Sequence, residues 1–269
     1  MYLWQISRKK IFFAIILLAA IAYLGYYLQE RAAQTPLLRA EVMIVFPEGM
    51  TMADMGKMLE EKELFQSAEF MKYKDRKNWP DKWLADYPFL RVAKTLEGYL
   101  FPDTYRFYAV TTPEVVAQRF LNNFKDKTKN LGEPDGSAED KLFGDLIVMA
   151  SVLEKEVRHP RDMAMVADIF WKRVNVGRGL ESDSTLNYIL DTGRASLTAK
   201  DLQTDSPYNT YKYKGLPPTP IANPGMNAMN ASWHPQANEY WYFLTDGEGN
   251  VHYGKTLEEH NSNKQKYLK

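Results

Sequence analysis

The chain has 269 residues, of which 45% are hydrophobic and 25% are charged, and these values are ordinary for a globular protein. Acidic and basic residues are equal in number, so the chain lacks the positive charge excess that is typical of nucleic-acid-binding proteins. It contains no cysteine, which excludes disulfides, a cysteine nucleophile and thiolate metal sites. Its four histidines have no metal-binding spacing, and we expect neither a metal nor another cofactor.

An uncharged run over residues 11–28 predicts a transmembrane helix. As a helix it would be about 27 Å long, which is close to the thickness of the hydrocarbon core of a bilayer. Basic residues precede the run and tyrosines occupy its far end, which predicts that residues 1–10 are cytoplasmic and that the rest of the chain lies outside the cytoplasm. A cleaved signal peptide is the alternative, weakly supported by the small residues Ala32 and Ala33. The length of the run and the bulky residues at its end favour an uncleaved anchor in the cytoplasmic membrane.

Residues 29–40 are predicted to form a linker, and residues 41–95 a small α/β unit. The segment EVMIVF at 41–46 is rich in strand-forming residues. Thr51 is the expected N-cap of a helix that reaches about Lys62 and whose methionines recur at helical spacing.

The remaining residues, 96–269, are predicted to form a larger mixed α/β domain, so the expected fold class is α+β. The expected elements are helices over 113–130, 142–158 and 161–174, strands over 240–244 and 251–254, and a polar C-terminal helix. Ser137 is the expected cap of the second of these helices. Residues 206–232 form a long stretch of low regularity, and loops of this length in a compact domain are usually functional or disordered.

The helix predicted over 142–158 carries the candidate catalytic carboxylate. At about 100° per residue, one apolar stripe of this helix is formed by Leu142, Leu146, Met149, Leu153 and Val157. Glu156 lies at the margin of the stripe and Glu154 lies on its far edge. A carboxyl group on an apolar face loses hydration, which favours the protonated form that a general acid needs. From this helix alone, an ion pair of Glu156 with Arg158 or Arg161 is the simpler interpretation.

Tyrosine and asparagine side chains are frequent in the segment 206–232. The rings of Tyr208 and Tyr211 can stack on sugar faces, while hydroxyls and amides such as that of Asn209 bind sugar hydroxyls. This composition suits an extended polysaccharide, although tyrosine-rich loops also form ordinary cores and protein interfaces.

Four runs of residues occur together in the chain in a fixed order. They are EGYLFPDTY at 97–105, MASVLEKE at 149–156, SPYNTYKYKGLPPTPIANPG at 206–225 and HP at 234–235. In these runs the chain resembles the endolytic murein transglycosylase family (MltG/YceG-like), from about Val42 to its C-terminus. The resemblance implies a single-pass protein of the inner (plasma) membrane with a small LysM-like unit and a catalytic domain on the periplasmic or cell-wall side. The implied substrate is the nascent glycan strand of peptidoglycan, and the implied partners are peptidoglycan synthases or divisome proteins.

The resemblance also implies roles for individual residues. Glu156, in the run LEKE, corresponds to the catalytic glutamate, and Asn209, Tyr211 and Asn223 would line the substrate groove. Asp183 is the candidate for a second carboxylate near the substrate; a helix cap or an ion-pair partner is the alternative. The implied reaction uses one glutamate as acid and then as base to form 1,6-anhydro-N-acetylmuramic acid ends. A catalytically silent glycan-binding or divisome scaffold protein is the alternative function.

Overall fold

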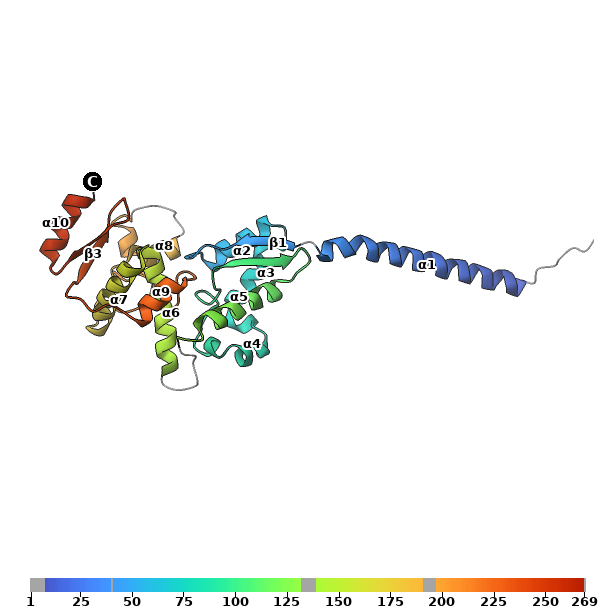
Figure 1. The fold of residues 1–269 in the computed structure, drawn as a ribbon, viewed down its shortest axis with the longest axis horizontal. Coiled ribbons are helices and arrows are strands. Elements are labelled where there is room, and N and C mark those ends of the chain that lie inside the picture. Colours follow the sequence, from blue (N-terminus) through green and yellow to red (C-terminus); the bar gives the residue numbers. More distant parts are fainter. Residues whose placement is uncertain (1–7, 40, 132–138, 191–196, 269) are drawn as a thin grey trace, which may run out of the picture.

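The computed structural model of the chain describes residues 8–39, 41–131, 139–190 and 197–268. A long N-terminal helix, α1 (Arg8–Arg39), extends away from a body of shorter helices and two small sheets (Figure 1). The helix continues through 29–39, where a linker is expected, because that segment begins with good helix formers such as Gln, Glu, Arg and Ala. In the described part of the chain, no helix is both long enough and apolar enough to cross a membrane. The side chains of residues 11–14, at the start of the expected span, lie outside the described set.

The first sheet pairs β1 (Glu41–Val45) with β2 (Thr104–Tyr108) in antiparallel register, with Ile44 opposite Tyr105. The strand expected at the start of the small unit is therefore confirmed. Its partner strand comes from the segment expected after residue 95, so the sheet includes residues from both sides of the expected boundary. The pairing follows from alternation, since the inward-facing Ile44, Tyr105 and Phe107 are buried.

Two capped helices cover this sheet. The helix α2 (Met52–Glu61) begins at Thr51, whose Oγ accepts a hydrogen bond from the backbone N–H of Asp54 at 3.1 Å. The helix α5 (Pro113–Thr128) begins in the same way at Thr112. Shorter helical segments lie between them, namely α3 (Ser67–Met71), η1 (Lys72–Lys74), η2 (Arg76–Asn78), α4 (Asp81–Asp86) and η3 (Pro88–Arg91).

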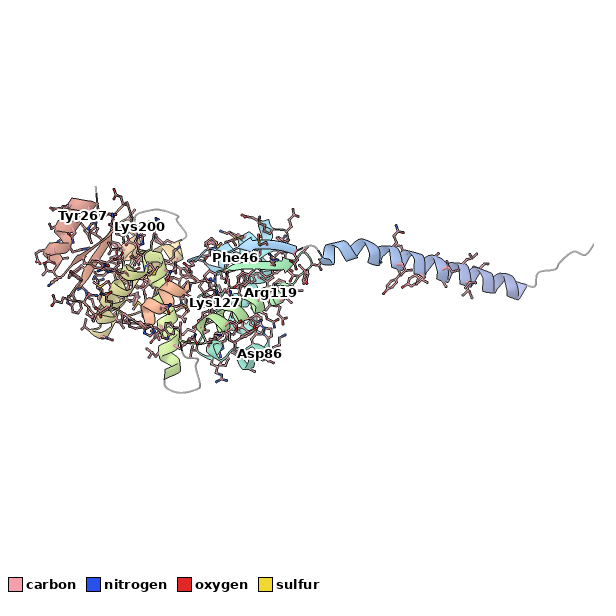
Figure 2. The ribbon with its side chains drawn as sticks, viewed as in Figure 1. Phe46, Asp86, Arg119, Lys127, Lys200 and Tyr267 are labelled. Carbon is pink, nitrogen blue, oxygen red and sulfur yellow. The ribbon has the colours of Figure 1, made fainter. Side chains whose placement is uncertain are left out.

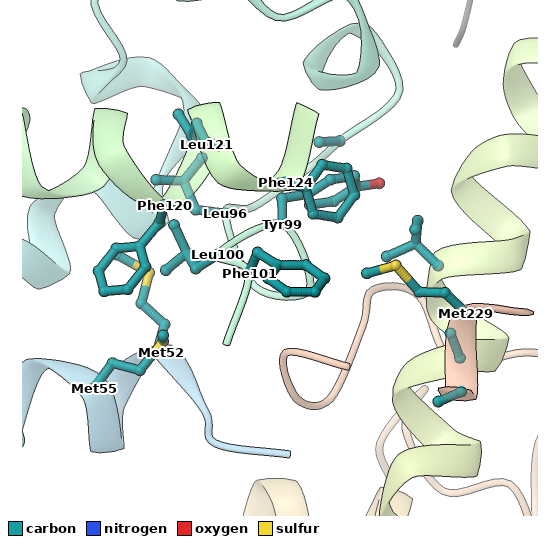
Figure 3. Close-up of a cluster of buried hydrophobic side chains, with 14 of the residues drawn as sticks. Met52, Met55, Leu96, Tyr99, Leu100, Phe101, Phe120, Leu121, Phe124 and Met229 are labelled. Carbon is teal, nitrogen blue, oxygen red and sulfur yellow. The ribbon is translucent and has the colours of Figure 1, made fainter. Parts of the chain in front are cut away.

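A continuous hydrophobic core joins the small sheet to the helices of the C-terminal half. Met52 and Met55 of α2 lie next to Phe120 of α5, beside Leu96 and Leu100 (Figure 3). Met229, from the C-terminal half, belongs to the same core. The two halves of the molecule therefore pack as one body, which fixes the position of the small unit next to the site described below.

The C-terminal half is organised around α6 (Glu139–Glu156), which packs against α7 (Pro160–Asn175) and α9 (Met226–Trp233). The first two helices confirm predicted ones, whereas α9 lies at the end of the stretch expected to be irregular. The single apolar stripe expected on α6 is wrong. Leu142 is 52% exposed, and every residue of 147–153 is buried, because neighbouring elements enclose the middle of the helix from all sides. The expected cap Ser137 lies outside the described residues.

The remaining elements complete a mixed α/β fold, as predicted. They are α8 (Asp183–Leu190), η4 (Asp201–Gln203), β3 (Tyr242–Thr245), β4 (Val251–Gly254) and α10 (Leu257–Tyr267). The strands β3 and β4 form an antiparallel hairpin, and α10 packs against it. This hairpin and the polar closing helix are therefore confirmed.

Candidate active site

The carboxyl group of Glu156 lies at the C-terminal end of α6, where the helix stops. Its Oε1 accepts a short hydrogen bond of 2.5 Å from the Ser182 hydroxyl and a longer one of 3.4 Å from the Ser184 backbone N–H. Burial raises the pKa of Glu156; the two serine residues oppose this shift, and the nearby charge of Asp183 adds to it. The end of α6 also carries the negative pole of the helix dipole, which favours the protonated carboxyl group. The surroundings of Glu156 therefore favour its protonated form, which is the form that a general acid needs.

The turn before α8 holds Ser182 in place. The backbone N–H of Ser182 donates to the Thr210 hydroxyl at 3.1 Å, and its carbonyl accepts from the Thr185 hydroxyl at 2.8 Å. The preceding residue, Glu181, has a positive φ of 56°, which is costly for a residue with a side chain. Ion pairs of Glu181 with Arg173 and Arg178 and a backbone bond to Thr210 retain this conformation.

Arg173 connects this turn to the C-terminal hairpin. Its guanidinium group is buried, donates to the carbonyl of Leu180 at 2.5 Å and donates twice to the carbonyl of Trp241. A buried guanidinium with fixed acceptors holds two backbone segments in one geometry. α7 therefore positions both the serine turn and the hairpin around Glu156.

Two cavities meet at Glu156 and Asp183. The first lobe has a volume of about 820 Å³ and lies between α2 of the small unit and α8. The second lobe has a volume of about 520 Å³ and lies between α8, β3 and α10. Because both lobes share the two carboxyl groups, Glu156 lies partway along an open groove rather than at a closed end.

The structure places three of the predicted substrate residues on this groove. Asp183 lines both lobes, and its Oδ1 accepts a hydrogen bond of 2.6 Å from the hydroxyl of Tyr211, which lines the second lobe. Tyr208 lines the first lobe, with its ring 5.4 Å from the ring of Tyr188 and its hydroxyl bonded to Thr219. Asp183, Tyr208 and Tyr211 are therefore positioned to contact a ligand.

The two predicted asparagines are instead fully buried. The amide of Asn209 donates to the carbonyls of Leu202 and Thr204, both at 2.9 Å, and its oxygen accepts from the Tyr211 N–H. These bonds shape the loop that carries Tyr208 and Tyr211 and leave no amide group directed at the groove.

Asn223 connects loops from both halves of the molecule. Its oxygen accepts from the backbone N–H groups of Gly98 and Leu100, at 2.9 and 3.0 Å, and its amide donates to the carbonyl of Met50 and to Glu97. These hydrogen bonds give Asn223 a structural role, because they hold loops from both halves of the molecule together.

Glu97 is a groove residue that sequence reasoning did not single out. It is 1% exposed; its Oε1 accepts from the Met52 N–H at 2.8 Å and from Asn223 at 3.0 Å, and its Oε2 accepts from the Tyr188 hydroxyl at 3.3 Å. Burial raises the pKa of Glu97 from its ordinary value of 4.5 to about 7. The feature of the sequence that could have identified Glu97 is its position at the start of a run that is dense in aromatic residues.

Glu154, the other acidic residue of the run LEKE, has a different environment. Its Oε2 accepts a hydrogen bond of 2.9 Å from the backbone N–H of Gly225, and burial raises its pKa. It lines neither of the two lobes at Glu156. Its contacts indicate that it holds the loop at Gly225 against α6.

The fold and the site define an α+β protein in which two glutamates with raised pKa values, Glu97 and Glu156, line an open, two-lobed groove, and Glu156 lies where the two lobes meet. Among the described residues, no group of three acidic or histidine side chains is arranged to hold a metal ion. Residues 25–266 match the YceG-like family model. The chain belongs to the YceG-like family, as the ordered motifs predicted.

Relatives of known name support this assignment. The chain is 36% identical to the endolytic murein transglycosylase of Bacillus subtilis (strain 168), over 72% of this chain and 54% of the relative. It is 28% identical to the endolytic murein transglycosylase of Streptococcus pneumoniae (strain R6), over 88% of this chain and 46% of the relative. The chain thus spans about half the length of these relatives. A crystal structure of a putative YceG-like protein from Listeria monocytogenes superposes with a TM-score of 0.71 at 31% identity, covering 82% of this chain and 75% of that one.

Proposed function

We propose that this protein is an endolytic lytic transglycosylase that cleaves the bond between N-acetylmuramic acid and N-acetylglucosamine in peptidoglycan strands. The observation that carries the proposal is the Glu156 carboxyl group, whose pKa burial raises and which lies where two lobes of an open groove meet. The names of the B. subtilis and S. pneumoniae relatives support the same reaction class.

One carboxyl group is sufficient for this reaction. Protonated Glu156 gives its proton to the glycosidic oxygen, and the bond from that oxygen to the anomeric carbon of the muramic acid breaks. The 6-hydroxyl oxygen of the same sugar then bonds to the anomeric carbon, and its proton passes to the Glu156 carboxylate. The product is a 1,6-anhydro ring, no water is consumed, and Glu156 is protonated again. An intramolecular nucleophile has a high effective concentration, so the enzyme need not position a water molecule.

The surroundings of Glu156 fit both protonation states. The Ser182 hydroxyl and the Ser184 N–H donate to Oε1, which leaves Oε2 to exchange the proton with the substrate. Asp183, held by Tyr211, is a second negative charge on the same groove and can stabilise positive charge that develops on the sugar ring.

The shape of the groove supports cleavage within a strand. The lobes extend from Glu156 toward α2 on one side and toward β3 and α10 on the other. A strand that occupies both lobes carries sugars on each side of the bond that is cleaved, which is the requirement for internal cleavage.

The test is to incubate the full chain, kept in detergent, with uncross-linked glycan strands and to analyse the fragments by mass spectrometry. The proposal predicts internal fragments with anhydro ends, each lighter by one water than the corresponding reducing end. Reducing ends would identify a hydrolase. Intact strands that nevertheless bind the protein would support the glycan-binding or scaffold function instead.

We also propose that the protein is anchored in the cytoplasmic membrane by residues 11–28, with residues 30–269 on the outer side. The uncharged run and the basic residues before it support this topology. In addition, the described apolar side chains of α1 are exposed along the helix (Figure 2), among them Leu17 at 62% and Leu18 at 65%.

This topology predicts that a reporter fused after Lys269, of a kind that is active only in the cytoplasm, gives no signal in cells. The same reporter fused at the N-terminus, before Arg8, should be active and serves as the matched control. A strong signal from the C-terminal fusion would reject the topology. A mature N-terminus near Ala33 would show instead that the segment is a cleaved signal peptide.

A further inference from the structure

The first lobe of the groove has one wall that the reaction itself does not use. Lys57 on α2 and Lys74 on η1, both from the small unit, line this lobe together with Glu156 and Asp183. The small unit therefore contributes cationic side chains to the same cavity as the proposed catalytic acid. The inference drawn from them rests on the proposed function and specifies the substrate of that site.

The acidic side chains of this lobe already accept hydrogen bonds within the protein. Asp54 accepts from the Thr51 hydroxyl at 2.7 Å, Glu97 accepts from three groups, and Asp183 accepts from Tyr211. They are therefore engaged with neighbours and do not pair with the two lysines.

The ammonium groups of Lys57 and Lys74 differ from these carboxyl groups. Across the described residues, neither Lys57 nor Lys74 forms an ion pair or a hydrogen bond, although other lysines of the chain do. Lys57 is exposed, and the Nζ of half-buried Lys74 lies 5.7 Å from the centre of the Tyr188 ring, on the wall of the lobe. Lys74 lowers the pKa of the nearby Glu97 without forming an ion pair with it. Two cations that face a ligand cavity, and that form no ion pair within the described residues, can receive an anionic ligand group at little desolvation cost.

A second observation concerns Asn187 of α8, which also lines this lobe. Its side-chain oxygen is buried and receives no hydrogen bond from the residues that the structure describes. A buried polar atom without a partner is rare in folded proteins and is a candidate contact for a ligand. An amide N–H of a peptide would satisfy this oxygen.

We propose that Lys57 and Lys74 bind the carboxylates of the peptide stem on the muramic acid, and that Asn187 accepts a hydrogen bond from an amide of that stem. The sugar backbone of a stem-bearing strand is uncharged, so its carboxylates belong to the stems. A muramic acid at Glu156 carries its stem beside the bond that is cleaved, and the first lobe is the neighbouring cavity with unpaired cations. The small unit thus binds the peptide stem, while Glu156 in the C-terminal half acts on the glycosidic bond.

The test measures binding with the full chain in detergent, in the Glu156→Gln background so that strands stay intact. The probes are fluorescently labelled uncross-linked strands with native stems and the same strands after their carboxylates have been converted to primary amides. We expect amidation to raise the Kd about threefold to tenfold, the range for two exposed ion pairs. In the Lys57→Gln/Lys74→Gln double variant, the two probes should bind equally. Raising the salt concentration should reduce the preference for native stems, since exposed charges are screened.

The matched control is Lys62→Gln, an exposed lysine at the end of the same helix and outside the lobe, which should keep the preference for native stems. The inference is overturned if the double variant keeps this preference, or if the parent protein binds both probes equally. The result of this binding test is separate from the result of the activity test of the proposed function, because binding is measured without turnover. A failure of the proposed function would appear instead as the absence of anhydro ends when the Glu156-containing chain is incubated with native strands.

Discussion

Replacement of Glu156 by glutamine should abolish nearly all formation of anhydro ends while leaving the fold intact. The amide keeps the shape of the side chain, and its oxygen can still accept from Ser182, but it has no acidic proton to donate. General acid–base groups typically contribute ~10²–10⁴-fold in rate, and a residue that acts first as acid and then as base should lie near the upper limit. The measurement is the rate of fragment formation from uncross-linked strands, together with circular dichroism of the variant.

The matched control for this experiment is Glu154→Gln. The glutamine oxygen can continue to accept from the N–H of Gly225, and the side chain lines neither lobe at Glu156. The rate should therefore fall far less than in Glu156→Gln. If the two variants exchanged their behaviour, the catalytic glutamate would be misassigned. If both kept full activity with unchanged circular dichroism, α6 would not be the catalytic helix.

The second large effect concerns the pH dependence of stability and arises from Glu97. Its pKa is about 7 in the folded protein, compared with an ordinary value of 4.5. Below about pH 4.5 the Glu97 carboxyl group is protonated in both the folded and the unfolded protein. Between pH 4.5 and about 7 it stays protonated in the folded protein but loses its proton in the unfolded protein. The stability that Glu97 contributes is therefore complete at low pH and is lost as the pH rises to about 7. The shift corresponds to roughly 3 kcal/mol of unfolding free energy.

Glu97→Gln should remove this pH dependence. The glutamine oxygen can accept from Met52 and Asn223, and its amide can donate to the Tyr188 hydroxyl, so the packing is kept. Urea unfolding between pH 4.5 and 8 should show the unmodified protein losing about 3 kcal/mol relative to the variant. Comparing the two proteins cancels the contributions of Glu154 and Glu156, whose pKa values are also raised.

Charges that face Glu97 modify the size of this effect. Lys74 lowers the pKa of Glu97 and Asp54 raises it, but burial is the largest cause. Parallel stability curves for the two proteins would mean that Glu97 is ionised in the folded state across the whole range. In that case the hydrogen bond from the Met52 N–H and the interaction with Lys74 would together offset burial.

Local signals in the sequence determined most of the secondary structure. Thr51 predicted the start of α2, and strands expected over 240–244 and 251–254 correspond to the hairpin at Tyr242–Thr245 and Val251–Gly254. Such signals act within a few residues and survive in any tertiary context. The family, too, could be predicted from sequence, because its four motifs are contiguous runs in a fixed order.

Contacts between distant residues were decided only by the tertiary structure. The helical phase of α6 favoured Glu156 over Glu154, but the single apolar stripe that this argument used is absent from the described helix, because its middle is buried on every side. Glu156 is set apart from Glu154 by Ser182, which is 26 residues away in the chain. Pairing of β1 with β2 across the expected domain boundary is likewise a long-range event that periodicity cannot reveal.

The asparagines show the same limit of sequence reasoning. Composition suggested Asn209 as a ligand for sugar hydroxyls, and the family resemblance implied that Asn209 and Asn223 line the groove, whereas the fold buries both amides. A buried amide must satisfy its donors and acceptors within the protein, and both bind backbone groups of distant or neighbouring loops. The sequence therefore determined which polar groups are available, and only the packing of the loops decided which of them face the groove.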